Sequence, residues 1–369
     1  MFEIYIRQLL ELAENHKKIN IVDLFKADSK RLEEFSIETN EIYFDYSKNL
    51  LTFDAYNKLV SFGAISYFTN YIRKMFNGET VNFTENRKAL HYLLRSYEKN
   101  LSGHVETEKQ LIKEQLTAME ELVSEVKNKK RLNSNEKFFS DVLVIGIGGS
   151  HLGPELVSEA LIDFHDDPFN MKFLVNADPN EFRATIGKLD AKKTLVIIIS
   201  KSMTTNETLL NLKAVKEWLI SQGVKDNDIG NHMITISSSK TLDALNIKPF
   251  KMLSFGDWVG GRYSLWSCAG LPIALQIGFA NFMKLLDGAS SIDEMFLNND
   301  INNNIPKLLA LIAFWNSRCL GKFSYAVMPY DTRLKLLPHY LQQLEMESNG
   351  KSVDFNGQDI LNHTTPLTW

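Results

Sequence analysis

The nine residues SKSMTTNET, Ser200 to Thr208, carry five hydroxyl side chains and one lysine directly after a β-branched run. Hydroxyl groups, together with the free N–H groups at the start of a helix, can hydrogen-bond all the oxygens of a phosphate monoester, and Lys201 adds positive charge. Alternatively, the segment only caps a helix, but a cap needs one hydroxyl and leaves the others unexplained. The pattern therefore favours a phosphate site.

A second anion-binding pattern is GIGGSHLGP, Gly146 to Pro154, a glycine-rich turn that we expect to open a helix at Leu152. Glycines let the main chain approach an anion closely, although a tight turn needed only for packing would look the same. His151 stands where a dinucleotide fingerprint requires its third glycine, which argues against an NAD-dependent oxidoreductase. Two such turns indicate one small phosphorylated ligand without an adenosine.

Two further segments contain groups for chemistry. DWVGGRYSLWSCAG places Arg262 after a glycine pair, where an arginine can stabilise an oxyanion or simply form a structural salt bridge. QQLEMESNGK offers Glu345 and Glu347 before an Asn-Gly turn. A glutamate shielded from water can act as a general base on a carbon acid, whereas a solvated helix end is the alternative.

The elements that must position these residues are short β-branched runs alternating with amphipathic stretches. The runs are DVLVIGIG, FLVNAD, TLVIIIS, HMITIS and KMLSF. Runs without polar alternation suit strands buried on both faces, so we predict an α/β fold with a doubly wound parallel sheet. Ligands of such sheets bind beyond the carboxyl ends of the strands, where the two glycine- and hydroxyl-rich turns stand.

The flanking regions have a different character. Residues 1 to about 132 read as mainly helical, with an apolar face formed by Ile112, Leu116, Met119, Leu122, Val123 and Val126. The Asn-rich stretch Asn298 to Pro306 predicts a linker, after which a helix and the strand FSYAVMPY begin a second unit.

Composition excludes several classes of function. The 369 residues carry a formal net charge of −4, which provides no field for holding nucleic acid. The only cysteines, Cys268 and Cys319, lie in apolar stretches, which favours buried thiols in a reducing compartment. The N-terminal residues lack a signal-peptide pattern, and the apolar stretch Leu265 to Met283 contains polar residues and a proline, so we expect a buried helix, no membrane span and a cytoplasmic protein.

Taken together, GIGGSHLGP, SKSMTTNET, DWVGGRYSLWS and QQLEMESNGK, in this order, closely resemble the defining segments of the phosphoglucose isomerases, members of the sugar isomerase (SIS) domain superfamily. NFTENRKALHYLLR, Asn82 to Arg95, is similar to that family's NxTExRxxLHxxLR stretch. The resemblance implies an N-terminal helical region over 1–132, a first SIS-type α/β domain over 133–297, and a linker with the start of a second SIS-type domain over 298–369.

The resemblance implies roles for individual residues. Phosphate contacts would come from Ser200, Lys201, Ser202 and Thr205, and sugar contacts from Gly149, Ser150 and Gln343. Arg262, with Gly261, matches the arginine that stabilises an enediolate. Glu347 matches the base that moves a proton between C2 and C1, and Glu207 a carboxylate that supports a ring-opening histidine.

That histidine lies, in the family, within a downstream segment that begins with tryptophan, and the present sequence ends at Trp369. His363 stands in a position that the family motif does not reserve, and His151 is assigned no role. We therefore expect this chain, as a fragment or an incomplete product, to hold the phosphate grip and the base but to lack the ring-opening pair. It would then be nearly inactive on cyclic glucose 6-phosphate.

The predicted function is aldose–ketose isomerisation of glucose 6-phosphate and fructose 6-phosphate by a homodimer, without metal or cofactor. No nucleic-acid or membrane partner is expected. The alternative is a non-catalytic sugar-phosphate-binding module, but a pure binder has no need of Arg262 and Glu347.

Overall fold

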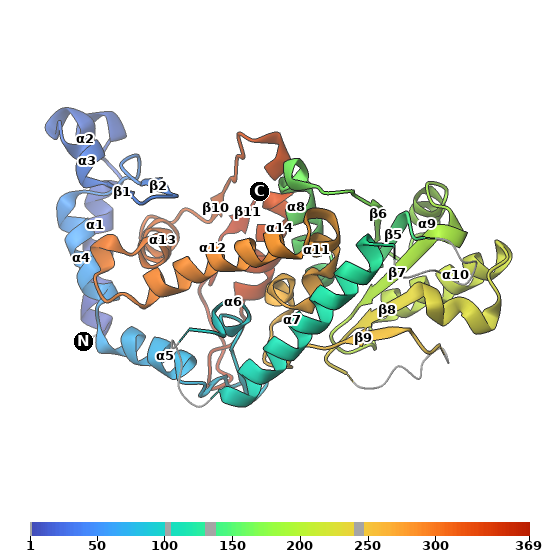
Figure 1. Cartoon of the computed structure of the whole chain (residues 1–369). Helices are drawn as coiled ribbons and strands as arrows, with labels where there is room; N and C mark the ends of the chain where they lie inside the picture. The colour runs from blue at the N-terminus through green and yellow to red at the C-terminus, as the bar shows by residue number, and fades with distance from the viewer. Residues whose placement is uncertain (1, 100–104, 130–137, 240–246) are drawn as a thin grey trace.

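The centre of the molecule is a five-stranded parallel sheet with the strand order β6-β5-β7-β8-β9 (Figure 1). The computed structural model describes residues 2–99, 105–129, 138–239 and 247–369. The strands are β5 (Asp141–Ile145), β6 (Asn170–Leu174), β7 (Thr194–Ile199), β8 (Met233–Ile236) and β9 (Lys251–Leu253). Every neighbouring pair is parallel, which confirms the five predicted strands and the α/β fold class.

The strand order creates a switch point between β5 and β7. The chain passes from β5 outward to β6 and then returns to the other side of β5 to form β7, which pairs with it from Asp141↔Thr194 to Ile145↔Ile198. Loops leaving such a pair diverge to opposite faces of the sheet and leave a crevice for ligands. The glycine-rich and hydroxyl-rich turns therefore follow adjacent strands.

Helices cover both faces of the sheet because successive side chains of each buried strand point to opposite sides. Val142 and Val144 pack with α7 (Glu106–Lys127) and α11 (Leu271–Ile277), whereas Leu143 and Ile145 pack with α10 (Asn206–Ser221). Figure 1 shows α7 and α11 on one side of the sheet and α10 on the other. The buried residues of α7 are the six predicted ones.

The remaining helices of this region are α8 (Leu152–Ala160), α9 (Pro179–Ile186) and α12 (Phe279–Leu297). The apolar stretch predicted as one buried helix is buried but divided, because α11 ends at Ile277 and α12 begins at Phe279. Gly278 between them has φ 81°, a conformation in which glycine is favoured. Both cysteines are buried free thiols, as predicted.

The N-terminal region is formed by α1 (Phe2–His16), α2 (Ile21–Ala27), α3 (Arg31–Glu34), α4 (Phe53–Gly63), α5 (Ser66–Phe76) and α6 (Leu93–Ser96). Two small antiparallel hairpins interrupt the helices and were not expected from the sequence. They are β1 (Ser36–Glu38) with β2 (Tyr43–Asp45), and β3 (Thr80–Asn82) with β4 (Arg87–Lys88).

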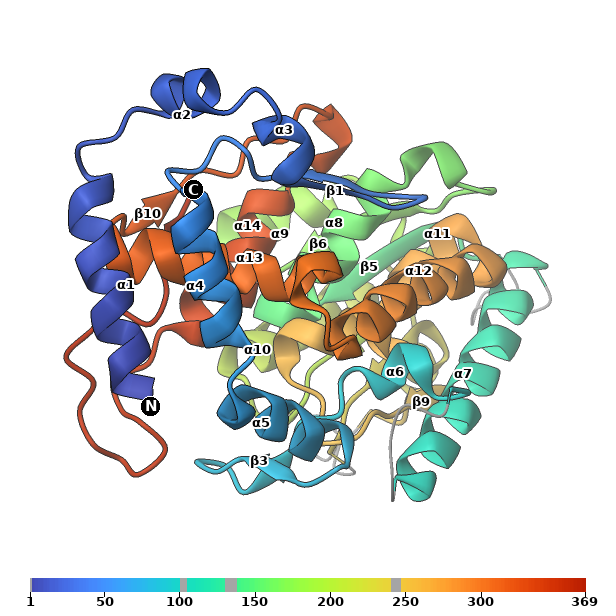
Figure 2. The ribbon, with the colours of Figure 1, turned by 90° about the vertical axis from the view of Figure 1, so that its left-hand side faces the viewer.

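A separate core joins the N-terminal helices to the segment that follows α12. Leu9 of α1 and Leu59 of α4 belong to the same buried cluster as Leu308 of α13 (Ile305–Phe314) and Trp315, and Figure 2 shows α1, α4 and α13 side by side. The indole N–H of Trp315 donates to the carbonyl oxygen of Leu50 at 2.9 Å. The segment after α12 is therefore packed onto the N-terminal helices.

The Asn-rich stretch between α12 and α13 is a connection held in place by hydrogen bonds of a buried asparagine. Asn304 is fully buried, and its amide group donates to the carbonyl oxygens of Met295, Phe296 and Asn298 at 2.6–3.1 Å. Its side-chain oxygen also caps α13 by accepting from the N–H of Lys307. The domain boundaries placed at residues 132 and 297 stay predictions.

The last part of the chain contains a π-helix at Trp315–Cys319, α14 (Leu337–Leu341), a second π-helix at Gln342–Glu347, and the short parallel pair β10 (Ser324–Tyr325) and β11 (Leu367–Thr368). Short 3₁₀ turns lie at Gly148–Ser150, Ile162–Phe164, Ala191–Lys193, Asp226–His232, Gly261–Trp266, Cys268–Gly270, Ile301–Asn303 and Thr332–Leu334. Among the described residues, no helix has both the length and the apolar character needed to cross a bilayer.

Candidate active site

The turn after β5 and the end of β7 meet at the switch point. A Cβ atom at Gly146 would lie 3.1 Å from the carbonyl oxygen of Ile199 and 2.8 Å from the Cβ of Ser150. Gly148 has φ 56°, and the chain then enters α8 at Leu152, the predicted residue. Glycine is required here because a side chain would separate the two loops.

The hydroxyl-rich loop after β7 is folded tightly at its start and open at its end. Ser200 is buried and its hydroxyl accepts from the N–H of Met203 at 3.2 Å, while Met203 itself has φ 54°. The exposed hydroxyl of Ser202 lies 2.7 Å from that of Thr204. Left-handed backbone at a methionine is uncommon and marks a loop whose shape is held by its surroundings.

The alternative that these hydroxyls only cap a helix is not supported. Thr205 is the N-cap of α10, and within the described chain its side chain makes no capping hydrogen bond. The hydroxyl of Thr208, in the first turn, is buried without a partner among the residues described. The N-terminus of α10 thus offers N–H groups and hydroxyls of the kind that bind an anion.

The glycine-rich turn is in direct main-chain contact with the arginine segment. A Cβ atom at Gly149 would lie 2.1 Å from the carbonyl oxygen of Gly261 and 2.9 Å from the amide nitrogen of Arg262. The hydroxyl of Ser264 donates to the carbonyl oxygen of Gly149 at 3.2 Å. These contacts bring Arg262 to the same edge of the sheet as the two loops.

One donor of Arg262, its Nε, has no partner among the described residues. Its guanidinium carbon lies 4.8 Å from the ring centroid of Tyr263, and its Nε is buried with no hydrogen-bond partner among the described residues. A purely structural salt bridge would be expected to satisfy that nitrogen, because buried unpaired donors are costly. Tyr340, on α14, donates to the carbonyl oxygen of Arg262 at 3.2 Å and fixes the main chain there.

Gln343 and Glu347 lie on the π-helix Gln342–Glu347, an element that often marks functional sites. The amide nitrogen of Gln343 would lie 2.8 Å from a Cβ at Gly148, and its side-chain oxygen is buried without a partner in the described part of the molecule. The hydroxyl of the buried Ser348 donates to the Glu347 carboxylate at 2.7 Å and lies 2.7 Å from the carbonyl oxygen of Gln343.

The two glutamates of this segment differ in their surroundings. Glu345 accepts a hydrogen bond from Tyr325 and so ties the π-helix to β10. Glu347 is exposed, and no hydrogen bond between described residues joins its carboxylate to Arg262 or to the hydroxyl loop. The shielding from water expected of a general base is therefore not found at Glu347, and its role as the base stays a prediction.

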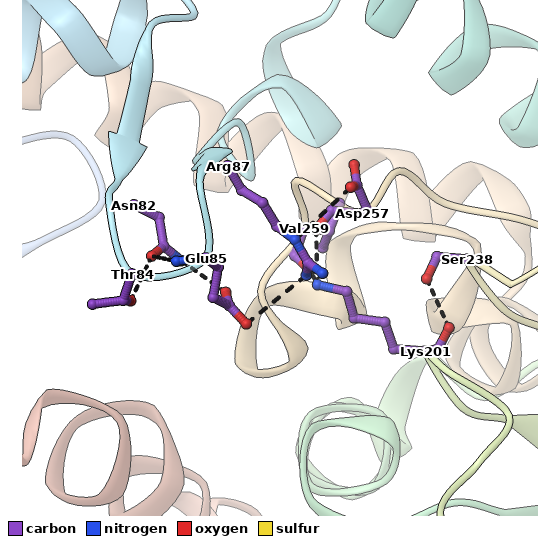
Figure 3. A network of polar contacts seen from close by, with 8 residues as sticks. All are labelled: Asn82, Thr84, Glu85, Arg87, Lys201, Ser238, Asp257 and Val259. Carbon is purple, nitrogen blue, oxygen red and sulfur yellow. Dashed lines mark hydrogen bonds and ion pairs between the residues drawn. The ribbon is translucent and has the colours of Figure 1, made fainter.

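Lys201 connects the hydroxyl loop with the arginine segment. Its ammonium group donates to the carbonyl oxygens of Asp257 at 2.8 Å and Val259 at 2.9 Å (Figure 3). Four segments that lie far apart in the sequence are thereby joined: the turn after β5, the loop after β7, the turn before Arg262, and the π-helix with Gln343.

The chain is similar to known proteins over nearly its whole length. A model of the phosphoglucose isomerase family matches residues 45–369. The chain belongs to the phosphoglucose isomerase family. It is 38% identical over 367 residues to glucose-6-phosphate isomerase 1 of Colwellia psychrerythraea, covering 98% of this chain and 67% of that protein.

Two other relatives give the same result. The glucose-6-phosphate isomerase of Acinetobacter baumannii is 40% identical over 369 residues, covering 99% of this chain and 66% of the relative. The crystal structure of a glucose-6-phosphate isomerase from Chlamydia trachomatis superposes with a TM-score of 0.89 at 26% identity, covering 99% of this chain and 69% of that one. The chain thus spans about two thirds of the length of these relatives.

Within this family member, the predicted site residues fall into two groups. The contacts described above bring together Gly149, Gly261, Arg262 and Gln343, with Lys201 tied to the same turn. Ser150 lies in the glycine turn, and Ser200, Ser202 and Thr205 lie in the neighbouring loop. Within the described residues, no hydrogen bond or ion pair joins Glu207 or Glu347 to the other predicted site residues. Glu207 is half-buried in the first turn of α10.

Several residues around the site were missed by sequence reasoning. His91 stacks on Tyr263 with ring centroids 3.9 Å apart and an interplanar angle of 9°. Burial, with smaller effects of Arg95 and Arg262, lowers the pKa of His91 to about 3. The histidine therefore stands neutral beside the arginine segment; its place in the NxTExRxxLHxxLR-like stretch was the available signal.

Two observations concern residues without an assigned role. His151 has a buried Nδ1 with no partner among the described residues, and burial lowers its pKa to about 4. His363 is exposed and contacts Phe323, with centroids 4.9 Å apart. In the described residues no group of His, Cys, Asp and Glu side chains is arranged to hold a metal ion.

Proposed function

We propose that this chain carries the phosphate grip, the oxyanion stabiliser and the base of an isomerase that interconverts glucose 6-phosphate and fructose 6-phosphate. The observation that carries the proposal is the meeting of Gly148 and Gly149 with Gly261, Arg262 and Gln343 beside an open, hydroxyl-rich helix N-terminus. In this region, the Nε of Arg262 and the side-chain oxygen of Gln343 are buried and have no hydrogen-bond partner among the described residues.

In the proposed binding mode, the phosphate lies at the start of α10. The hydroxyls of Ser200, Ser202 and Thr205 and the main-chain N–H groups of their loop hydrogen-bond its oxygens, and Lys201 adds positive charge nearby. Gly149 and Ser150 line the path of the sugar from this loop toward Arg262, because the glycine turn contacts both. Gln343 supplies an amide that can bind a sugar hydroxyl.

The proposed chemistry moves one proton between neighbouring carbons. In the open-chain aldose, the carboxylate of Glu347 removes the proton from C2, and the electron pair of that bond forms a C1–C2 double bond while the carbonyl π pair moves to O1. The donor of Arg262 stabilises the negative charge of this cis-enediolate. A proton moves between O1 and O2, and Glu347 returns its proton to C1 to give the ketose.

The remaining assignments of the proposal concern ring opening and assembly. Glu207 is assigned to support the acid/base that opens the ring. A homodimer in the cytoplasm is proposed from membership of the family, and the two buried free thiols fit a reducing compartment.

The test combines binding with isotope exchange. Calorimetric titration with 6-phosphogluconate and with gluconate measures the phosphate grip, and we expect strong preference for the phosphorylated ligand. Incorporation of deuterium from D₂O into fructose 6-phosphate measures the proton transfer, and the open-chain ketose present in solution makes this readout independent of assisted ring opening.

The matched variants are Glu347→Gln and Glu217→Gln, the latter an exposed glutamate on α10. We expect Glu347→Gln to abolish the exchange and to leave binding of 6-phosphogluconate within about tenfold, because the amide keeps the shape but cannot take a proton. Glu217→Gln should behave as wild type. Tight binding without exchange in the wild type would favour the sugar-phosphate-binding module, and equal affinity for gluconate would contradict both assignments.

A further inference from the structure

Lys201 is anchored at both its main chain and its side chain. Its carbonyl oxygen accepts hydrogen bonds from the Ser238 hydroxyl at 2.7 Å, the Ser237 hydroxyl at 3.1 Å and the Ser238 N–H at 3.2 Å. Its ammonium group reaches in the other direction, to the carbonyl oxygens of Asp257 and Val259. Figure 3 shows the extended side chain bridging the two loops.

The two carbonyl oxygens belong to the turn that leads into Arg262. Val259 is fully buried, and its N–H donates to the carbonyl oxygen of Gly256 at 3.1 Å. Packing and this hydrogen bond hold the buried part of the turn in place. Gly260 and Gly261 then follow, and a Cβ atom at Gly261 would touch nothing within 4 Å. The two glycines have no side chains that could pack and fix the main chain. The position of Arg262 therefore depends on hydrogen bonds to the turn.

Charged groups of both signs act on the ammonium group of Lys201. The guanidinium group of Arg87 lies 3.9 Å from the carboxylate of Asp257 and 3.9 Å from that of Glu85. Burial and, secondarily, Arg87 lower the pKa of Lys201, while Glu85 and Asp257 oppose the shift. An ammonium group that left the turn for a phosphate would leave two carbonyl oxygens without a donor, which costs free energy.

We propose that the side chain of Lys201 is a positioning residue: its bonds to the Asp257 and Val259 carbonyl oxygens hold the turn before Arg262 against the phosphate-binding loop. This inference rests on the proposed function and refines it, because the contacts to the phosphate then come from the hydroxyls and main-chain N–H groups of the loop.

The first test does not depend on catalysis. Lys201→Met removes the donor at similar length, and Lys213→Met on the exposed face of α10 is the matched control. We expect amide hydrogen exchange of a peptide spanning 255–265 to accelerate by about tenfold or more in Lys201→Met, with no change in the peptide that contains β5. Unchanged exchange in 255–265 would overturn the inference whatever the activity of the protein.

The second test separates a positioning residue from a phosphate ligand. With inorganic phosphate as the probe, Lys201→Met should alter the dissociation constant less than about threefold, whereas a direct charge-assisted contact predicts a much larger loss. The rate of deuterium exchange into fructose 6-phosphate should fall by about 10- to 100-fold with little change in KM, because small displacements of catalytic groups are costly.

A double-mutant cycle excludes a merely structural role. In the Arg262→Ala background, Lys201→Met should reduce the remaining deuterium exchange by less than about twofold, since the residue acts through Arg262. Full additivity of the two losses would contradict the inference. Lys201→Gln, which keeps one donor on a shorter side chain, serves if the methionine variant does not fold, and we expect intermediate protection of 255–265.

Discussion

The main chains of Gly149 and Gly261 approach so closely that a Cβ atom on Gly149 would lie 2.1 Å from the carbonyl oxygen of Gly261. The reverse is not true, because a Cβ on Gly261 would meet nothing within 4 Å. The two glycines therefore differ in the side chain that their positions can accept. Gly149 has no room for a Cβ atom because the two main chains touch there, whereas Gly261 has space for one.

The first prediction uses this asymmetry. Gly149→Ala should destabilise the protein by about 1–3 kcal/mol or more and abolish binding of 6-phosphogluconate, because the turn and the Arg262 segment must separate. Gly261→Ala should keep the melting temperature within about 2 °C of wild type, since its methyl group enters open space. Thermal unfolding and calorimetry check both; equal stability of the two variants would contradict the close contact.

The second prediction concerns the NxTExRxxLHxxLR-like stretch, whose last arginine is largely covered, with 12% of its side chain exposed. Arg95 donates twice to the carboxylate of Asp293, at 2.7 Å each, and its guanidinium lies over Trp266. Asp293→Ala should lower the free energy of unfolding by about 3–5 kcal/mol because it leaves a buried cation unpaired.

Its control lies one residue along α12. Glu294 pairs with Lys99 at 2.6 Å, but both side chains are exposed, so Glu294→Ala should cost less than about 1 kcal/mol. Urea denaturation of the two variants under the same conditions makes the comparison. Similar losses from the two substitutions would show that burial of the Arg95 pair is unimportant.

The third prediction is a loss of stability on mild acidification. Burial lowers the pKa of His91 from 6.5 to about 3 and that of His151 from 6.5 to about 4, so the folded protein keeps both histidines neutral. The unfolded chain binds these protons near pH 6.5. Between that value and pH 3–4 the unfolded state binds more protons, and each histidine removes up to about 1.4 kcal/mol of stability per pH unit as pH falls.

The variant His91→Phe isolates this effect because it can retain the ring stack on Tyr263 without titrating. Its free energy of unfolding, measured in urea between pH 7 and pH 5, should decline less steeply than that of wild type. The matched control variant is His363→Phe, at an exposed position. A slope unaffected by His91→Phe would mean that this histidine titrates normally.

The fourth prediction is that neither thiol reacts in the folded protein. Burial raises the pKa of Cys268 to about 12 and that of Cys319 to about 11, so the thiolate fraction at pH 8 is very small. Ellman's reagent should therefore label no thiol in the native chain and two after unfolding in urea. Labelling of one native thiol would show that the residues packed over this cysteine move away and expose it to the reagent.

Much of the fold could be predicted because local patterns and tertiary burial agree. The β-branched runs became β5 to β9, and the six apolar positions from Ile112 to Val126 are the buried face of α7. The hairpins β1–β2 and β3–β4 were missed because strands of two or three residues leave almost no periodic signal. The helix break at Gly278 was missed because the stretch from Leu265 to Met283 is largely apolar on both sides of this glycine.

The residues of the candidate site stay predictions, and their contacts could not be predicted from the sequence. Residue types and motifs suggested Arg262 and Glu347, and the resemblance to the family added Gln343. Nothing in QQLEMESNGK indicates a π-helix, because that element depends on how the segment packs. The direction of the Lys201 side chain depends on carbonyl oxygens 56 and 58 residues further along the chain. Long-range partners of this kind follow from the topology of the sheet and the loops, which composition and spacing do not encode.

The core shared by α1, α4 and α13 has a consequence for co-translational folding. Leu9 and Leu59 cannot be covered until Leu308 and Trp315 have been synthesised, about 300 residues after Leu9. At roughly 5–20 residues per second, that interval is about 15–60 s. During this time the apolar faces of the first helices remain available to chaperones or to other nascent chains, so slow translation or early termination exposes them longest.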